Sequence, residues 1–96
     1  MLVDSHCHLD HSKMELSPAD AVRQARDAGV ERIVTICTRL DRYELVNSLA
    51  APFDDVFMGV GVHPHEAGDA GLDSPEPLIE LATNPKMVGV GETGLD

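Results

Sequence analysis

Four short, mostly apolar runs recur along the chain with helix-like segments between them, and this alternation constrains the fold more than any other feature. The runs cover residues 2–5, 33–37, 56–62 and 87–91. Most of their positions are continuously apolar rather than alternating with polar residues, which is typical of strands covered on both faces of a parallel sheet. The pattern predicts four strands in an α/β fold.

Three helices are predicted between these strands, across residues 17–29, 38–51 and 74–84. The first has the clearest start, because the hydroxyl of Ser17 can cap a helix whose first position is Pro18. Gly29 is placed to end the same helix. The elements therefore follow the order β-α-β-α-β-α-β, which predicts right-handed crossovers between parallel strands.

Two architectures fit this order: an open doubly wound sheet, or the first half of an eight-stranded barrel. Four strands could complete an open sheet within 96 residues, whereas a (β/α)8 barrel needs about 250. The fourth apolar run passes directly into Gly91–Asp96 without a closing helix. We therefore expect residues 1–96 to be one partial domain, the first half of a TIM-type (β/α)8 barrel that is truncated after strand 4.

The composition excludes some classes of function. Acidic residues number 17 against 7 basic ones, for a formal net charge of −10, and the basic residues form no cluster. This balance argues against a module that holds nucleic acid by a basic surface. If the substrate is a phosphodiester, bound divalent cations would have to meet its charge. The sequence has no apolar segment of membrane-spanning length and no signal peptide, so we expect a cytoplasmic protein without membrane contact.

The two cysteines, Cys7 and Cys37, do not form a C-x-x-C pair. This spacing makes a zinc knuckle or a thioredoxin-type motif a poor explanation for them. We expect both to be reduced, buried thiols that pack as small apolar side chains.

His6 and His8 lie where the first strand is predicted to end. Because side chains alternate along a strand, the two imidazoles should point to one side and Cys7 to the other. Two imidazoles at the C-terminal end of a barrel strand can ligate one metal ion. The alternative is a pair of hydrogen-bonded histidines that bind no ligand.

Two further strand ends carry candidate residues, His63 after the third strand and Glu92 after the fourth. A carboxylate that ends an apolar strand is costly without a partner, and a metal ion would be such a partner. The alternatives are an exposed turn for His63 and a basic or helix-capping partner for Glu92. The G-x-G-x-x-G spacing of residues 89–94 does not indicate a dinucleotide site, because the chain ends before the required acidic residue. Ligand-type side chains nevertheless converge from three strand ends.

Three segments, Asp4–Asp10, Gly61–His65 and Gly91–Asp96, resemble signature segments of the TatD family of metal-dependent deoxyribonucleases, in the same order. The resemblance implies a TIM-type barrel with a two-metal centre at its mouth. It implies His6 and His8 as ligands of one metal and Glu92 as a catalytic carboxylate that bridges two. By the same analogy, His63 would contact the substrate phosphate.

The resemblance also implies a 3′-5′ exonuclease that acts on DNA, single-stranded or at 3′ ends, with two divalent ions, Mg²⁺ or Mn²⁺, or Zn²⁺ as an alternative. The family takes two more histidines and an aspartate from later strands, so we expect the fragment alone to be inactive. Two rivals remain open: a hydrolase of esters or amides with the same centre, and a non-catalytic remnant that acts as an interaction module. Asp4 and Asp10 are expected to accept hydrogen bonds from the ligand imidazoles.

Overall fold

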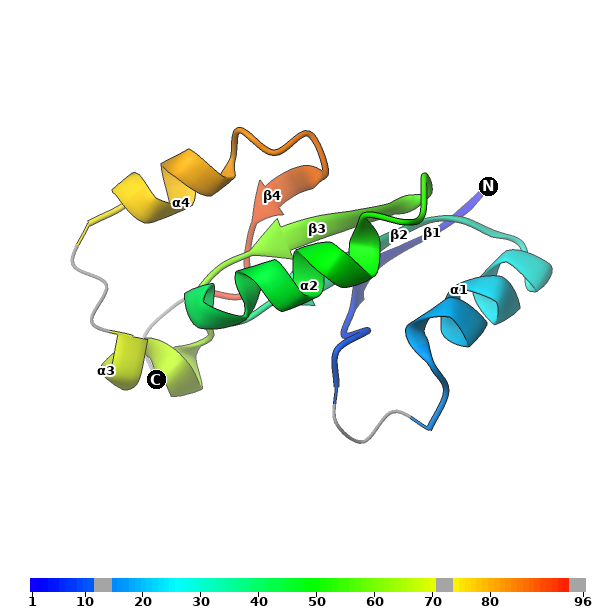
Figure 1. Ribbon diagram of the computed structural model, residues 1–96, viewed down its shortest axis with the longest axis horizontal. Coiled ribbons are helices and arrows are strands. Elements are labelled where there is room, and N and C mark those ends of the chain that lie inside the picture. Colours follow the sequence, from blue (N-terminus) through cyan, green and yellow to red (C-terminus); the bar gives the residue numbers. More distant parts are fainter. Residues whose placement is uncertain (12–14, 71–73, 94–96) are drawn as a thin grey trace.

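The computed structural model describes residues 1–11, 15–70 and 74–93, which form one parallel sheet with helices between its strands (Figure 1). The sheet has the order β1-β2-β3-β4, so each strand lies beside its neighbour in the chain. Its strands are β1 (Leu2–Cys7), β2 (Val30–Cys37), β3 (Val56–Val60) and β4 (Met87–Val90). A doubly wound sheet reverses its strand order at a switch point. The uninterrupted order is that of the first half of a TIM-type barrel, as predicted.

The three predicted helices are present as α1 (Pro18–Asp27), α2 (Tyr43–Ala50) and α4 (Glu76–Leu81). A 3-10 turn, η1 (Leu40–Arg42), precedes α2 and occupies the predicted start of that helix. Two short elements after β3 were not predicted, η2 (Pro64–Glu66) and α3 (Ala67–Ala70). Among the described residues, none of the helices has the length and apolarity that a bilayer crossing requires.

The boundaries of α1 follow from its capping residues. The Ser17 hydroxyl accepts a hydrogen bond from the Asp20 backbone N–H at 3.2 Å, and Pro18 occupies the first helical position. Gly29, at φ 94°, follows the last turn in a left-handed conformation that favours glycine. Between these ends, α1 directs Val22 into the core, where it is fully buried.

The core lies between the sheet and the helices that cover one of its faces, with α2 lying across the middle strands (Figure 1). β2 and β3 pair so that alternate residues share a face, with Ile33 opposite Val56 and Cys37 opposite Val60. This face packs against α1 and α2. The buried apolar residues of the cluster are Leu9, Val22, Ile33, Cys37, Val46, Ala50, Val56, Met58 and Val60.

The two outer strands are much less covered than the middle pair. Leu2 and Val3 of β1 are 59% and 51% exposed, and Val88 and Val90 of β4 are 57% and 58% exposed. The prediction of strands covered on both faces is therefore wrong for β1 and β4 within this chain. Among the described residues, no further strand pairs with the outer edge of β1 or β4, as it would in a closed barrel.

Candidate metal centre

The segments that follow the four strands are tied together at one rim of the sheet. Backbone hydrogen bonds of 3.0–3.1 Å join the segment after β3 to the end of β2, and the segment after β4 to the end of β3. A hydrogen bond to a side chain of β2 holds the segment after β1. These bonds are Gly61 N–H to Cys37 O, His63 N–H to Thr38 O, Gly91 N–H to Val60 O and Leu9 N–H to Thr35 Oγ1. The rim therefore has a fixed backbone on which side chains from separate strands can meet.

β1 continues through His6 and Cys7, two residues beyond its predicted end. Its pairing with β2 is irregular here. Asp4 pairs with Ile33 and Cys7 with Thr35, so β1 has one more residue than β2 between these two pairs. Such a bulge re-aims side chains, and bulges are common beside functional sites. Here it places Cys7 against the core, while the rings of His6 and His8 lie 5.1 Å apart in an edge-to-face arrangement.

Glu92 follows β4 with φ 55°, the one positive φ of a non-glycine residue in the described ranges. Next to it, the chain after β3 passes very close to Gly91, the residue before Glu92. A Cβ on Gly61 would overlap the Gly91 carbonyl oxygen and lie 2.8 Å from Thr93 Cγ2. The chain therefore turns sharply after Gly91, and the turn directs Glu92 towards the end of β1.

The Glu92 carboxylate lies among three imidazoles. Its Oε2 is 3.2 Å from His6 Nε2 and 3.7 Å from His8 Nε2, and its Oε1 is 3.3 Å from His63 Nε2. The structure thus brings together all four side chains that the sequence singled out, from the ends of β1, β3 and β4. The Glu92 side chain is 23% exposed, so solvent reaches only part of the cluster.

The donor set fits a divalent cation. Glu92 Oε2 is buried and has no hydrogen-bond partner among the described residues, which is unfavourable for a carboxylate oxygen. One ligand atom from each of His6, His8 and Glu92 lies within 4.8 Å of the others. Ligands held at about 2.1 Å from one tetrahedral ion are about 3.4 Å apart, close to the two distances from Oε2. Two imidazoles and a carboxylate are also ligands that such cations take in proteins.

His63 differs from the other two histidines in its hydrogen bonding. Its Nδ1 accepts the backbone N–H of His65 at 3.0 Å. A neutral imidazole whose Nδ1 is an acceptor carries its proton on Nε2. His63 Nε2 therefore presents an N–H, which can donate to an oxygen but cannot ligate a metal.

A cavity of about 360 Å³ opens at the rim beside the cluster. It is lined by His8, His11, Thr38, His63, His65, Glu66 and Glu92. Thr38 and Glu66 were not predicted as site residues. Thr38 directly follows β2, so its strand-end position was the available signal, although threonine is not a ligand-type residue.

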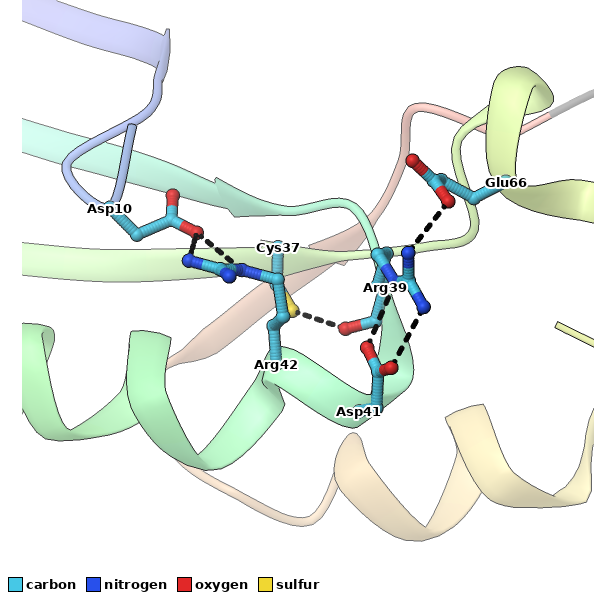
Figure 2. A network of polar contacts seen from close by, with 6 residues as sticks. All are labelled: Asp10, Cys37, Arg39, Asp41, Arg42 and Glu66. Carbon is cyan, nitrogen blue, oxygen red and sulfur yellow. Dashed lines mark hydrogen bonds and ion pairs between the residues drawn. The ribbon is translucent and has the colours of Figure 1, made fainter. Parts of the chain in front are cut away.

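Asp4 and Asp10 do not make the contacts expected of them. Asp4 Oδ1 accepts the backbone N–H of His6 at 3.1 Å, and Asp10 Oδ2 accepts from Arg42 Nε and Nη2 at 3.1 and 3.0 Å (Figure 2). The expectation that both would hold imidazole N–H groups rested on closeness in sequence. It overlooked Arg42, which reaches Asp10 from the end of η1.

A second polar network fixes the segment after β2. Arg39 donates to both oxygens of Asp41 at 3.0 and 2.9 Å and to Glu66 Oε2 at 3.0 Å (Figure 2). The Cys37 thiol donates to the Arg39 carbonyl at 3.0 Å. Since Glu66 belongs to η2, Arg39 joins the end of β2 to the element that follows His63.

Both cysteines are free thiols, Cys37 buried and Cys7 half-buried. Burial raises the pKa of Cys7 to about 11, with a smaller contribution from the nearby Asp4 carboxylate and an opposing one from a hydrogen bond with Thr35. Burial also raises the pKa of Cys37. At neutral pH both side chains are therefore protonated and pack as small apolar groups, as predicted.

Comparison with known proteins relates almost the whole chain to one family. The family model described as TatD related DNase matches residues 3–96. Three relatives illustrate the similarity. The chain is 33% identical over 95 residues to the "3′-5′ ssDNA/RNA exonuclease TatD" of Escherichia coli (strain K12), 35% over 98 residues to the "Uncharacterized metal-dependent hydrolase YcfH" of the same strain, and 30% over 98 residues to an "Uncharacterized metal-dependent hydrolase" of Buchnera aphidicola.

Each of these matches covers 99% of the chain but only 36–37% of the relative. The chain therefore spans a little over a third of the length of the curated relatives it matches. The matched region contains the ends of all four strands and hence the whole cluster around Glu92.

Proposed function

We propose that this chain, which belongs to the family of TatD related DNases, provides the first half of the active site of a metal-dependent hydrolase that cleaves DNA phosphodiesters. The observation that carries the proposal is the Glu92 carboxylate, which has three imidazole nitrogens within 3.7 Å. The names of its relatives support the same chemistry, since one is called a 3′-5′ ssDNA/RNA exonuclease and others metal-dependent hydrolases. The remaining ligands would come from beyond residue 96.

His6, His8 and Glu92 would hold the first cation through Nε2, Nε2 and Oε2. Glu92 Oε1 points to the other side of the carboxylate, towards His63, and leaves Glu92 able to bridge to a second ion. Bound divalent cations supply Lewis acidity, lower the pKa of a water molecule and neutralise phosphate charge. Mg²⁺ or Mn²⁺ suits this use, and Zn²⁺ is the alternative that imidazole ligands admit.

His63 would bind substrate rather than metal. Its Nε2–H, fixed by the hydrogen bond at Nδ1, can donate to a phosphate oxygen placed beside Glu92. Such a donor stabilises charge that builds up on that oxygen as the phosphodiester is attacked. Glu92 is the catalytic carboxylate, since it would position the ions against the reacting phosphate.

The proposed substrate is single-stranded DNA or DNA at 3′ ends. With a net charge of −10 and dispersed basic residues, this chain cannot attract a nucleic acid through a broad basic surface. Recognition of the phosphate at the site would instead come from the cations and from His63. We therefore expect the binding of DNA to depend strongly on the bound metal.

The metal ligands are tested by titrating the protein with Mn²⁺ in a calorimeter. We expect Glu92→Gln to weaken Mn²⁺ binding by about tenfold or more, because the amide loses the ligand charge. Glu80→Gln, on the exposed surface of α4, is the matched control and should bind as the wild type does. Equal Mn²⁺ affinity in Glu92→Gln and wild type would disprove the role of Glu92.

A second variant separates substrate contact from metal binding. His63→Ala should keep the Mn²⁺ affinity of the wild type but lower kcat/KM for a 3′-labelled single-stranded oligonucleotide, by about 100-fold. Loss of Mn²⁺ binding in this variant would instead make His63 a metal ligand. Acyl esters assayed in parallel test the substrate class, and turnover of esters but not DNA would overturn the nuclease assignment.

A further inference from the structure

A second cavity, of about 210 Å³, lies beside the candidate metal centre. It is lined by His8, Asp10, His11, Thr38 and Arg42. His8, His11 and Thr38 also line the cavity that contains Glu92, so the two cavities share a wall. The two cavities therefore lie side by side at the rim.

The walls of this second cavity come from two segments that are adjacent in the fold. His8–His11 follow β1, and Thr38 and Arg42 follow β2, the strand that pairs with β1. The bond from Leu9 N–H to the buried Thr35 hydroxyl holds the first segment against the second. The cavity is thus formed by the described residues of this chain and is held in place by its own sheet.

Arg42 is the only residue with a permanent positive charge among the described residues that line the two cavities. All other charged or titratable groups in these walls are histidines and carboxylates. The Arg42 side chain is 42% exposed, whereas that of Asp10 is 13% exposed. The Arg42 side chain is therefore the more accessible of the two, although both residues line the cavity.

The ion pair orients Arg42 but uses only some of its N–H donors. Nε and Nη2 both contact one oxygen, Asp10 Oδ2, at 3.1 and 3.0 Å (Figure 2). A guanidinium has five N–H donors in a planar fork, and the Nη1 side lies outside this pair. Arginine in such a position can bind a carboxylate on one edge and a phosphate on another.

We propose that this second cavity is a subsite for the phosphate next to the scissile one, and that Arg42 donates hydrogen bonds to its oxygens. The proposal rests on the proposed function, since it takes the scissile phosphate to lie at Glu92. It extends that function by making the enzyme prefer a strand over a single phosphodiester. Asp10 acts as a positioning residue that holds the guanidinium at the cavity wall.

The test compares two substrates in a complete, Mn²⁺-loaded barrel that carries residues 1–96, since these residues alone are expected to be inactive. A thymidine dinucleotide has the scissile phosphate alone, whereas a trinucleotide has one neighbouring phosphate as well. We expect Arg42→Gln to raise KM for the trinucleotide by about tenfold and to leave kcat and the dinucleotide KM unchanged, because one charge-assisted contact is lost. Arg23→Gln, which removes an exposed ion pair on α1, is the matched control and should leave both KM values unchanged.

Asp10→Asn distinguishes the subsite from a merely structural ion pair. Both Asp10→Asn and Arg42→Gln abolish the pair, but only Arg42→Gln removes the donors. We expect Asp10→Asn to leave the trinucleotide KM close to that of the wild type, because the amide oxygen can still accept from Arg42 and hold the guanidinium in place. An equal rise in KM in the two variants, on either substrate, would overturn the proposal, as would a wild-type trinucleotide KM in Arg42→Gln.

Failure of the proposed function would look different. If the wild type hydrolysed neither substrate, the subsite would be tested by fluorescence anisotropy with a labelled thymidine trinucleotide in the presence of Mn²⁺. Weaker binding by Arg42→Gln than by Arg23→Gln would support the subsite even then. Equal binding by the two variants would overturn it.

Discussion

Gly61, which follows β3, lies against the backbone of Gly91, the residue before Glu92. The backbone of Gly91 fills the space that a side chain at position 61 would need. Gly61→Ala must therefore push Gly91 away and move the carboxylate that follows it. We expect this variant to bind Mn²⁺ about tenfold more weakly and to lose about 1–3 kcal/mol of stability, the usual cost of forcing a group into packed space.

Gly89→Ala is the matched control for this prediction. Gly89 lies on β4, and a Cβ there would meet nothing within 4 Å. Calorimetric Mn²⁺ titration and thermal unfolding of the two variants give the comparison. Wild-type affinity in Gly61→Ala would mean that the close approach to Gly91 does not set the position of Glu92.

At the residue scale, the sequence could indicate His6, His8, His63 and Glu92, because each follows an apolar run and parallel strands end at one rim. Other features depend on contacts between distant segments and had no sequence signal. The left-handed backbone of Glu92 lies next to the close approach of Gly61 to Gly91. The Asp10–Arg42 pair joins residues that are 32 positions apart, and nothing local to either residue predicts it.

At the element scale, one ion pair joins α1 to the turn before β3. Arg26 donates to both oxygens of Asp55 at 2.6 Å, and these hydrogen bonds hold the pKa of Asp55 below its ordinary value. A carboxylate whose folded pKa is lowered stabilises the fold above its unfolded pKa, and this contribution disappears as the pH falls through the folded value. The pair should therefore matter at neutral pH and not in strong acid.

We expect Asp55→Asn to lower Tm at neutral pH by roughly 2–4 °C, a small change because the pair is partly exposed. In strong acid, wild type and variant should unfold at the same temperature. Asp54→Asn, at the exposed neighbouring position, should have a smaller effect at neutral pH. A Tm difference for Asp55→Asn that persisted in strong acid would show that the carboxylate charge is not its cause.

The elements were predicted well where a single local signal decided them. Ser17 and Gly29 bracket α1 as expected, while β2 begins at Val30, three residues before the predicted start at Ile33. Residues 31 and 32 are charged and were not read as strand, but pairing with β1 extends the strand through them. The short elements η2 and α3 were not predicted; Pro64 occupies the first position of the 3-10 helix η2.

At the scale of the whole molecule, the sheet has two outer strands with exposed apolar side chains. β1 and β4 each present an unpaired edge to solvent among the described residues, and such edges favour pairing with another chain. Residues 1–96 produced alone should therefore self-associate, which sedimentation velocity measures. A compact monomer that unfolds cooperatively would contradict this expectation.

A charge on the β4 edge should reduce this association. Val90→Lys places a lysine on a strand whose residue 90 is 58% exposed, and lysine on an edge strand opposes pairing. Ile79→Lys is the matched control, since Ile79 is 61% exposed but belongs to α4. Equal loss of association in both variants would indicate general apolar contact rather than edge pairing.

Alternation of four strands with three helices suits both an open sheet and a half barrel, and the half barrel was predicted because no closing helix follows the fourth run. The pairing of consecutive strands decides between them. That residues 1–96 form one partial domain stays a prediction. Its physical basis is the exposed state of β1 and β4, which a closed barrel would cover.

The left-handed backbone of Glu92 has an evolutionary consequence. A side chain in that conformation costs about 1 kcal/mol relative to glycine, so glycine is the thermodynamically preferred residue there. A lineage that stopped using the carboxylate would gain stability by mutating this position, and drift would erase the acid quickly. A glutamate retained there across distant descendants would thus indicate continuing selection for the chemistry of the carboxylate, because stability alone favours glycine.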